Sequence, residues 1–203
     1  MSKWSEIYKK QMSMFDSLDD FINSKVSYKK KLIDIIKKYA TSNKKLLEVG
    51  CGSGVTSIFL ERAGYQTLGI DSDPDMVKLA MSILVQQRSM ASFKVDDIRT
   101  LKTIHDRFDV IFSNGVMEHF SDSEIVSIVN RHLSIGDYVI VSIPSDYFSD
   151  DQKIYGDERF MGTAQWRSIL SETTGVIVEE FGFDSDKTAG EKPQFIGFVL
   201  SSL

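Results

Sequence analysis

Residues 46–57, with the sequence LLEVGCGSGVTS, decide the fold of this chain. The stretch begins with a short apolar run, which is typical of a buried parallel strand. Glycines follow at alternate positions, Gly50, Gly52 and Gly54, and the next residues can continue as a helix. A strand, a glycine turn and a helix in this order form the ligand-binding unit of a doubly wound sheet. Glycine suits the turn because it accepts positive φ angles and lets a ligand lie against bare backbone.

The spacing of these glycines excludes two kinds of ligand site. A phosphate-binding P-loop ends in Gly-Lys-Ser/Thr, whereas Val55 follows the last glycine here. A dinucleotide fingerprint needs GxGxxG or GxGxxA, and counting from the first or second glycine puts Val55 or Ser57 at its last position. What remains is the pattern ExGxGxG, with Glu48 leading.

This pattern resembles motif I of the class I S-adenosylmethionine (SAM)-dependent methyltransferases, in which an acidic residue precedes alternating glycines. The resemblance implies SAM as cofactor, S-adenosylhomocysteine (SAH) as its product, and an acceptor that is a small molecule. It implies these cofactor-binding residues in the motif: Glu48, Gly50, Cys51, Gly52 and Gly54. A glycine-rich turn without a ligand is the alternative. For Cys51, a small residue in a tight turn is a better interpretation than a reactive thiol.

Strands and helices alternate along most of the chain, which predicts an α/β fold with a mainly parallel, doubly wound sheet. Apolar runs mark the expected strands: residues 46–49, 66–71, 91–95, 108–112, 138–143, 176–183 and 195–200. No helix separates the last two strands, so we expect them to pair antiparallel across the polar connection 184–193. The methyltransferase resemblance implies a Rossmann-like sheet of seven strands in the order 3-2-1-4-5-7-6.

The 203 residues fit one domain, residues 1–203. We expect an N-terminal helical lid over 1–42, formed by two helices with a break near residues 16–19, and an α/β core over 43–203. Within the core, the acidic and aromatic segment 145–163 lies where this family varies with its acceptor, and long loops are often functional lids. Arg159 in that segment is expected either to hold an acceptor anion or to pair with Asp157.

The composition restricts the class of partner. The net charge of −5 argues against a nucleic-acid partner, because nucleic-acid-binding domains tend to be basic. The single cysteine excludes an intramolecular disulfide and favours the cytoplasm. We expect no membrane partner, because no apolar run approaches the ~20 residues of a membrane span, and the first residues lack the apolar core of a signal peptide. The composition leaves monomer and homodimer both open.

The second strand is followed by an acidic residue at a position that suits a ribose. Asp71 lies 19 positions after Gly52, and an acid at this distance accepts hydrogen bonds from ribose hydroxyls. The alternative for Asp71 is a turn or cap residue, since Pro74 opens a helix and Asp73 is a candidate cap. We also include Ser72 and Met76 among the expected cofactor contacts.

Two further motifs of the family have counterparts here. The resemblance of DDIRTL to the family's acidic motif implies that Asp97 accepts the adenine amino group and that Ile98 packs on the ring, although a shift of one residue to Asp96 is open. Residues 113–120, SNGVMEHF, resemble the fourth motif of small-molecule methyltransferases. This likeness places a further set near the methionine part of the cofactor: Ser113, Asn114 and Gly115.

His119 is the candidate catalytic residue. The fourth motif places it near the methyl group, and a side chain with an ordinary pKa near 6.5 suits proton abstraction at neutral pH. Alternatively, His119 and Glu118 are structural and bond to backbone or to each other. We expect His105 and His132 to lie at the surface without a role, and no Cys/His spacing indicates a metal.

In related methyltransferases, aromatic residues of an N-terminal helix fold over the cofactor. Trp4 and Tyr8 lie one helical turn apart, and Tyr8 is expected to reach the cofactor carboxylate. Together these motifs predict methyl transfer from SAM to an O, N or C nucleophile of a small molecule. The alternatives are a non-catalytic SAM- or adenosine-binding regulator and, with less support from the glycine spacing, a nicotinamide-dependent oxidoreductase.

Overall fold

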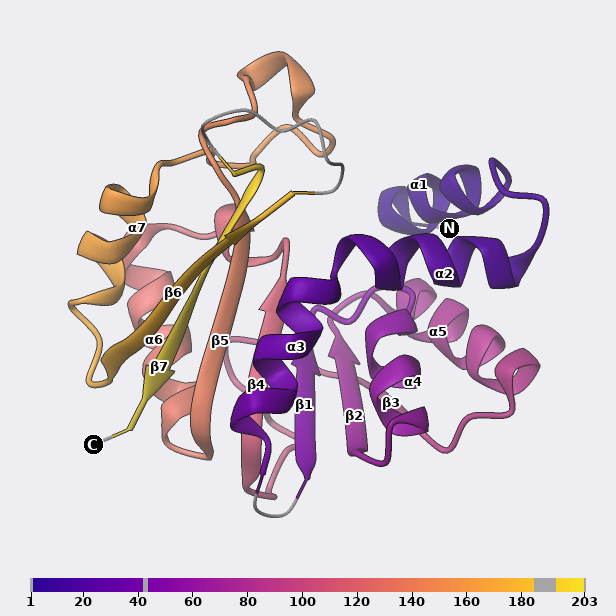
Figure 1. Cartoon of the computed structure of the whole chain (residues 1–203), viewed down its shortest axis with the longest axis horizontal. Helices are drawn as coiled ribbons and strands as arrows, with labels where there is room; N and C mark the ends of the chain where they lie inside the picture. The colour runs from indigo at the N-terminus through magenta and orange to yellow at the C-terminus, as the bar shows by residue number, and fades with distance from the viewer. Residues whose placement is uncertain (1, 42–43, 185–192, 203) are drawn as a thin grey trace.

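The computed structural model describes residues 2–41, 44–184 and 193–202. Its strands form one sheet in the order β3-β2-β1-β4-β5-β7-β6 (Figure 1). Their bounds are β1 Lys45–Val49, β2 Gln66–Asp71, β3 Ser92–Val95, β4 Phe108–Asn114, β5 Gly136–Pro144, β6 Val176–Phe183 and β7 Phe195–Ser201. The pairs from β3 to β5 are parallel, and β7 runs antiparallel to both β5 and β6. The predicted fold and strand order are confirmed, while most of the connection 184–193 lies outside the described residues.

Helices cover both faces of this sheet (Figure 1). Their bounds are α1 Lys3–Met12, α2 Leu18–Tyr28, α3 Lys30–Tyr39, α4 Val55–Arg62, α5 Pro74–Gln87, α6 Asp122–Leu133 and α7 Thr163–Leu170, with short 3₁₀ turns at Met117–His119 and Asp150–Gln152. Among the described helices, none combines the length and the apolar character that a membrane span requires.

The alternation of side chains along the strands divides the core into two layers. In β1, Leu46 packs with α3 and α4 on one face, whereas Leu47 and Val49 pack with α6 and α7 on the other. All three residues are buried, being at most 1% exposed. Apolar residues on both sides are what a central parallel strand requires.

The prediction of two helices before the sheet is wrong, because the described part of this region contains three. The second expected helix is interrupted at Lys29, whose backbone (φ −88°, ψ 6°) ends α2 and begins α3. Because of this interruption, α2 and α3 pack against different parts of the protein. The buried residues of α3, which include Leu32 and Ile36, pack on the sheet, while Phe21 and Ile22 of α2 pack with residues of α4 and α5.

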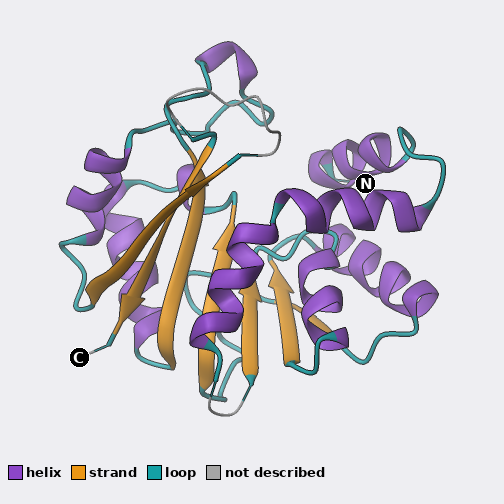
Figure 2. Cartoon of the chain, viewed as in Figure 1, coloured by secondary structure: helices purple, strands orange, loops and turns teal. Residues whose placement is uncertain are grey.

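The first two helices lie at the end of the sheet where a ligand is expected. Figure 2 shows α1 and α2 beyond the arrowheads of β1 and β2, over the loops that leave these strands. Open α/β sheets bind their ligands outside the carboxyl ends of the strands. The fold therefore brings α1 and the glycine turn after β1 to the same side of the molecule.

Candidate active site

The glycine turn after β1 uses the conformational freedom of all its glycines. Gly50, Gly52 and Gly54 have φ angles of 67°, 54° and 71°, values that side chains with a Cβ adopt reluctantly. The turn is tied to β2 by a hydrogen bond from Cys51 N to Ile70 O (2.9 Å). A Cβ on Gly52 would lie 2.8 Å from the Tyr8 hydroxyl oxygen, so helix α1 closes over bare backbone here.

Glu48, the acid that leads the motif, lies beneath the turn. Its carboxylate accepts hydrogen bonds from Ser57 N (3.0 Å) and Ser57 Oγ (2.6 Å), which join β1 to the first turns of α4. Burial raises the pKa of Glu48, while nearby Lys29 and the hydrogen bonds from Ser57 oppose that rise. Glu48 does not line the cavity above the turn, so its observed partners are structural.

A cavity of about 420 Å³ lies above the glycine turn, at the carboxyl ends of the parallel strands. This volume is within the usual range of about 300–1,000 Å³ for ligand sites. Among the residues predicted from the sequence, these line it: Tyr8, Gly50, Gly52, Asp71, Ser72, Met76, Ile98, Asn114, Gly115 and His119. These do not: Glu48, Cys51, Gly54, Asp97 and Ser113. Gly54 instead begins α4, and a Cβ on it would collide with the ring of Phe93.

Asp71 faces the cavity from the end of β2. One carboxylate oxygen accepts a hydrogen bond from Gly52 N (3.0 Å) and the other from Asp73 N (3.0 Å). Each carboxylate oxygen has two acceptor positions, so these bonds leave capacity for hydroxyl donors. Burial raises the pKa of Asp71, and the backbone bonds oppose that rise. Asp73 is the helix cap, since its side chain accepts from Asp75 N (2.9 Å), and the two acids therefore have separate tasks.

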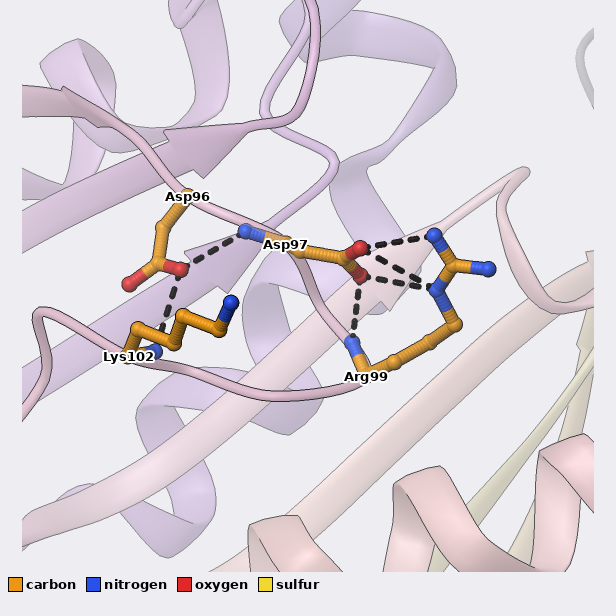
Figure 3. Close-up of polar contacts among 4 residues, drawn as sticks. All are labelled: Asp96, Asp97, Arg99 and Lys102. Carbon is orange, nitrogen blue, oxygen red and sulfur yellow. Dashed lines mark hydrogen bonds and ion pairs between the residues drawn. The ribbon is translucent and has the colours of Figure 1, made fainter.

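The two acids after β3 also differ (Figure 3). The carboxylate of Asp97 pairs with Arg99, with Nη2 at 2.7 Å and Nε at 3.0 Å, and the hydrogen bond to this side chain lowers the pKa of Asp97. The carboxylate of Asp96 accepts from Lys102 N (3.1 Å), Thr103 N (2.8 Å) and Thr103 Oγ1 (2.7 Å). Asp96 and Ile98 line the cavity and Asp97 does not, which favours the register shifted by one residue.

The loop after β4 lies at the centre of the site. Asn114 donates from Nδ2 to the Tyr28 hydroxyl (3.0 Å) and accepts at Oδ1 from Ser142 Oγ (3.2 Å), so its side chain is held from two sides. Ser113 is buried, and its Oγ has no hydrogen-bond partner among the described residues. Gly115 adopts a φ of 69°, which turns the chain back towards the cavity.

His119 is oriented by residues from two distant segments. Its Nδ1 lies 2.6 Å from Asp157 Oδ1, in the loop between β5 and α7. Its ring and that of Trp4 of α1 make an edge-to-face contact, with centroids 5.8 Å apart. Trp4 in turn stacks on Tyr155 at 5.2 Å. The N-terminal helix and the segment 145–163 thus both contact His119.

Glu118 precedes His119, and the sequence predicts at most a structural role for it. Its side chain is 3% exposed, and its Oε2 has no hydrogen-bond partner among the described residues. Burial raises the pKa of Glu118 to about 8, with a further contribution from the nearby acids Glu158 and Asp157. Unpartnered buried carboxyl groups are rare because they lose their hydration without compensation.

Other cavity residues carried no motif. Ser2 and Lys3 line it, together with Tyr155 and Asp157. Their positions depend on how α1 and the segment 145–163 fold over the sheet, which local patterns do not describe. Among the described residues, no group of His, Cys, Asp or Glu side chains is placed to hold a metal ion.

The prediction of surface positions for both remaining histidines holds for His105 and is wrong for His132. His132 is fully buried on α6, and its Nε2 lies 3.0 Å from Ile98 O, beneath the cavity wall. Burial lowers the pKa of His132 to about 4, which keeps the ring neutral. The sequence does indicate this burial, because His132 falls on the same helical face as Ile128 and Val129.

Comparisons with known proteins agree with this geometry. Residues 46–135 match the family model described as a methyltransferase domain. The ubiquinone biosynthesis O-methyltransferase of Coxiella burnetii is 31% identical over 81 residues, a match that covers 40% of this chain and 35% of that protein. The ribosomal protein L11 methyltransferase of Thermosipho melanesiensis is 31% identical over 85 residues, 41% of this chain and 32% of that protein. The matches thus span about a third of these relatives.

Solved structures share the fold over nearly the whole chain. A SAM-dependent methyltransferase from Clostridium acetobutylicum superposes with a TM-score of 0.71 at 14% identity, covering 98% of both chains. Magnesium protoporphyrin IX methyltransferase from Synechocystis, solved with bound SAM, gives a TM-score of 0.68 at 18% identity, covering 99% of this chain and 90% of that one. The fold is therefore that of Rossmann-like methyltransferases.

The family match, the relatives and the fold together support membership of this chain in the class I SAM-dependent methyltransferase family. This family uses SAM as its cofactor. The residues present fit that group: the glycine turn offers backbone without side chains, and Asp71 and a cavity of about 420 Å³ lie directly beside it.

Proposed function

We propose that this protein transfers a methyl group from SAM to an O, N or C nucleophile of a small molecule. The observation that carries the proposal is the cavity of about 420 Å³. The glycine turn, whose glycines have positive φ angles, and the carboxylate of Asp71, which keeps free acceptor positions, both face it. We also propose, from the sequence, a cytoplasmic protein that is a monomer or a homodimer.

Each part of the cavity has a proposed partner in the cofactor. The backbone at Gly50 and Gly52 would lie along it, and Asp71 would accept hydrogen bonds from the ribose hydroxyls. Ile98 would pack on adenine, beside Asp96 or Asp97. The remaining proposed contacts lie towards the methionine part: Tyr8, Asn114 and Gly115. When bound, SAM supplies a methyl group on a positively charged sulfur, which already carries its leaving group.

The work left to the chain is to align the acceptor, exclude water and accept a proton. Alignment alone can supply effective molarities of about 10⁵–10⁸ M. Trp4 and Tyr155, which stack on each other, both line the cavity, and we propose that they limit the access of water to it. We propose His119 as the base, because the contact of its Nδ1 with Asp157 orients the ring and leaves Nε2 for the acceptor's proton.

Calorimetric titration of the purified protein with SAM, SAH and NADH tests the cofactor. SAM and SAH are expected to bind and NADH is not. In Asp71→Asn, SAH affinity should fall about 10-fold or more, because a hydrogen bond to a charged group contributes about 1.5–3 kcal/mol. Asp34→Asn is the control, since Asp34 is exposed on α3 and pairs with Lys30 at the surface.

The outcomes separate the proposed enzyme from its alternatives. Tighter binding of NADH than of SAH would contradict the proposal and favour an oxidoreductase. Unchanged SAH affinity in Asp71→Asn, with an unchanged melting temperature, would remove Asp71 from the site. SAH binding without methyl transfer to any compound in an acceptor screen would favour a regulator that binds SAM.

A further inference from the structure

A second cavity, of about 210 Å³, lies beside the first. It is formed by α1, α2, the segment after β5 and the start of β7. Both cavities share these lining residues: Trp4, Tyr8, Asn114, Gly115 and His119. The two cavities therefore adjoin at these residues. Its volume is below the range of about 300–1,000 Å³ for typical ligand pockets, which suits a compound of about one ring.

One side of the second cavity is a series of aromatic rings in contact. Phe160 and Phe148 have centroids 5.6 Å apart, and Phe148 and Phe195 are 5.8 Å apart. Tyr28 continues the series at 5.7 Å from Phe195. Aromatic rings favour offset-stacked or edge contacts with other rings at these separations. The wall thus favours a planar aromatic ligand over a flexible or strongly hydrated one.

Lys25 brings an uncompensated positive charge to the same cavity. Its ammonium donates to Gln11 Oε1 (2.9 Å) and lies 5.6 Å from the ring centroid of Tyr8, and it has no ion pair among the described residues. Burial lowers the pKa of Lys25 to about 8, with a further contribution from Lys29. A partly buried ammonium that lacks a counter-ion is stabilised when an anion binds beside it.

Glu118 supplies a polar group to the second cavity, next to Gly115, which both cavities share. Its Oε2 is buried without a partner among the described residues. Its Oε1 lies beside Gly115, 3.4 Å from the point that a Cβ on this glycine would occupy. The neighbouring acid Glu158 is engaged elsewhere, because its carboxylate accepts from the backbone N–H groups of Tyr155 (2.6 Å) and Gly156 (2.7 Å). Glu118 lines the second cavity, and no described side chain competes for its Oε2.

We propose that the second cavity binds the methyl acceptor as a small aromatic anion. Its ring lies against the wall of Phe148 and Phe195, its negative group lies beside Lys25, and its O–H or N–H group hydrogen-bonds to Glu118. This orientation directs the protic group towards the junction, where His119 faces both cavities. The inference rests on the proposed function, because it names the acceptor class for the same site.

The test is calorimetric titration of the SAH-saturated protein with matched probes. The probes are benzoates with a hydroxyl or amino group at the ortho, meta or para position, the corresponding benzamides, and the corresponding cyclohexanecarboxylates. At least one benzoate is expected to bind ten times more tightly than its neutral amide and its non-aromatic counterpart. No benzoate binding, or equal affinity for benzoate and benzamide, would overturn the proposal.

Variants test whether Lys25 is the positive charge that binds the carboxylate of the probe. Lys25→Met is expected to weaken the best benzoate about 10-fold and to leave its benzamide unchanged, whereas Lys30→Met, at an exposed site on α3, should change neither. Glu118→Gln should weaken benzoates with a protic substituent more than unsubstituted benzoate. Equal losses for acid and amide in Lys25→Met would overturn the role of the charge.

SAH affinity, measured first in every variant, reports whether the protein is folded and separates the two proposals. If SAH binds and no probe binds, the acceptor class is wrong and the cofactor site stands. If SAH does not bind to the unmodified protein, the proposed function itself fails, and the acceptor proposal fails with it.

Discussion

Replacing Glu118 with glutamine is expected to stabilise the protein at pH 8.5 and to change its stability little at pH 5. Burial raises the pKa of Glu118 from 4.5 to about 8 in the folded state. A carboxyl group whose folded pKa is raised stabilises the fold while it is protonated, and this contribution is lost as the pH rises through the folded pKa. Glutamine has the same shape and stays neutral at both pH values.

The size of the effect follows from that difference in pKa. Each pH unit between the unfolded and the folded pKa changes the free energy of unfolding by about 1.4 kcal/mol, which sets an upper bound of about 4–5 kcal/mol. Because the carboxyl group borders a cavity that admits water, we expect about 2–3 kcal/mol. For a chain of this length, the melting temperature of Glu118→Gln should exceed that of the unmodified protein by roughly 5–10 °C at pH 8.5.

The assay is thermal or urea denaturation, followed by circular dichroism at several pH values between 5 and 9. His132 titrates in the opposite sense: burial lowers its pKa to about 4, so its contribution is lost as the pH falls. This residue is present in both proteins and cancels in the comparison. Glu172→Gln, at an exposed site, is the control and should follow the unmodified protein. If Glu118→Gln and the unmodified protein lose stability in parallel up to pH 9, the carboxyl group is not held neutral by burial.

Two further substitutions test the glycine turn and the proposed base. Gly54→Ala should lower the free energy of unfolding by about 2–4 kcal/mol in urea denaturation, because the alanine has a strained positive φ angle and its Cβ collides with Phe93. Gly64 also has a positive φ angle, but a Cβ there would meet no neighbour, so Gly64→Ala should lower the free energy of unfolding by about 1 kcal/mol. Equal losses in the two variants would contradict the collision. His119→Gln should lower kcat for an identified acceptor about 10²–10⁴-fold with little change in SAH affinity, and an unchanged kcat would remove His119 as base.

The parts of the fold that follow from local chemistry could be predicted from the sequence. The apolar run of β1 is buried on both sides, as a central strand must be, and the glycines after it adopt the positive φ angles that motivated the prediction. The strand order came from the family resemblance, because hydrophobic periodicity says which residues are strands and not which strands are neighbours.

Other features depend on choices that local patterns leave open. Asp96 and Asp97 are equally polar, and their partners separate them: Asp96 accepts from Lys102 N and Thr103 N, whereas Asp97 pairs with the Arg99 side chain. The interruption at Lys29 has no proline or glycine to mark it; it is imposed by the different directions in which α2 and α3 pack. Glu118 is a polar residue type that is usually exposed, and it is buried here because segments distant in sequence close over it.

The place of β7 in the sheet has a consequence for how the molecule is assembled during synthesis. β7 follows β6 in the chain, yet it lies between β5 and β6. Until residues 195–201 have left the ribosome, the backbone groups of β5 on that side have no partner, and β6 has no neighbour on which to pair. An unpaired strand edge of this kind is prone to join other chains. The nascent protein should therefore be vulnerable to aggregation, and most dependent on chaperones, in the interval before β7 is released.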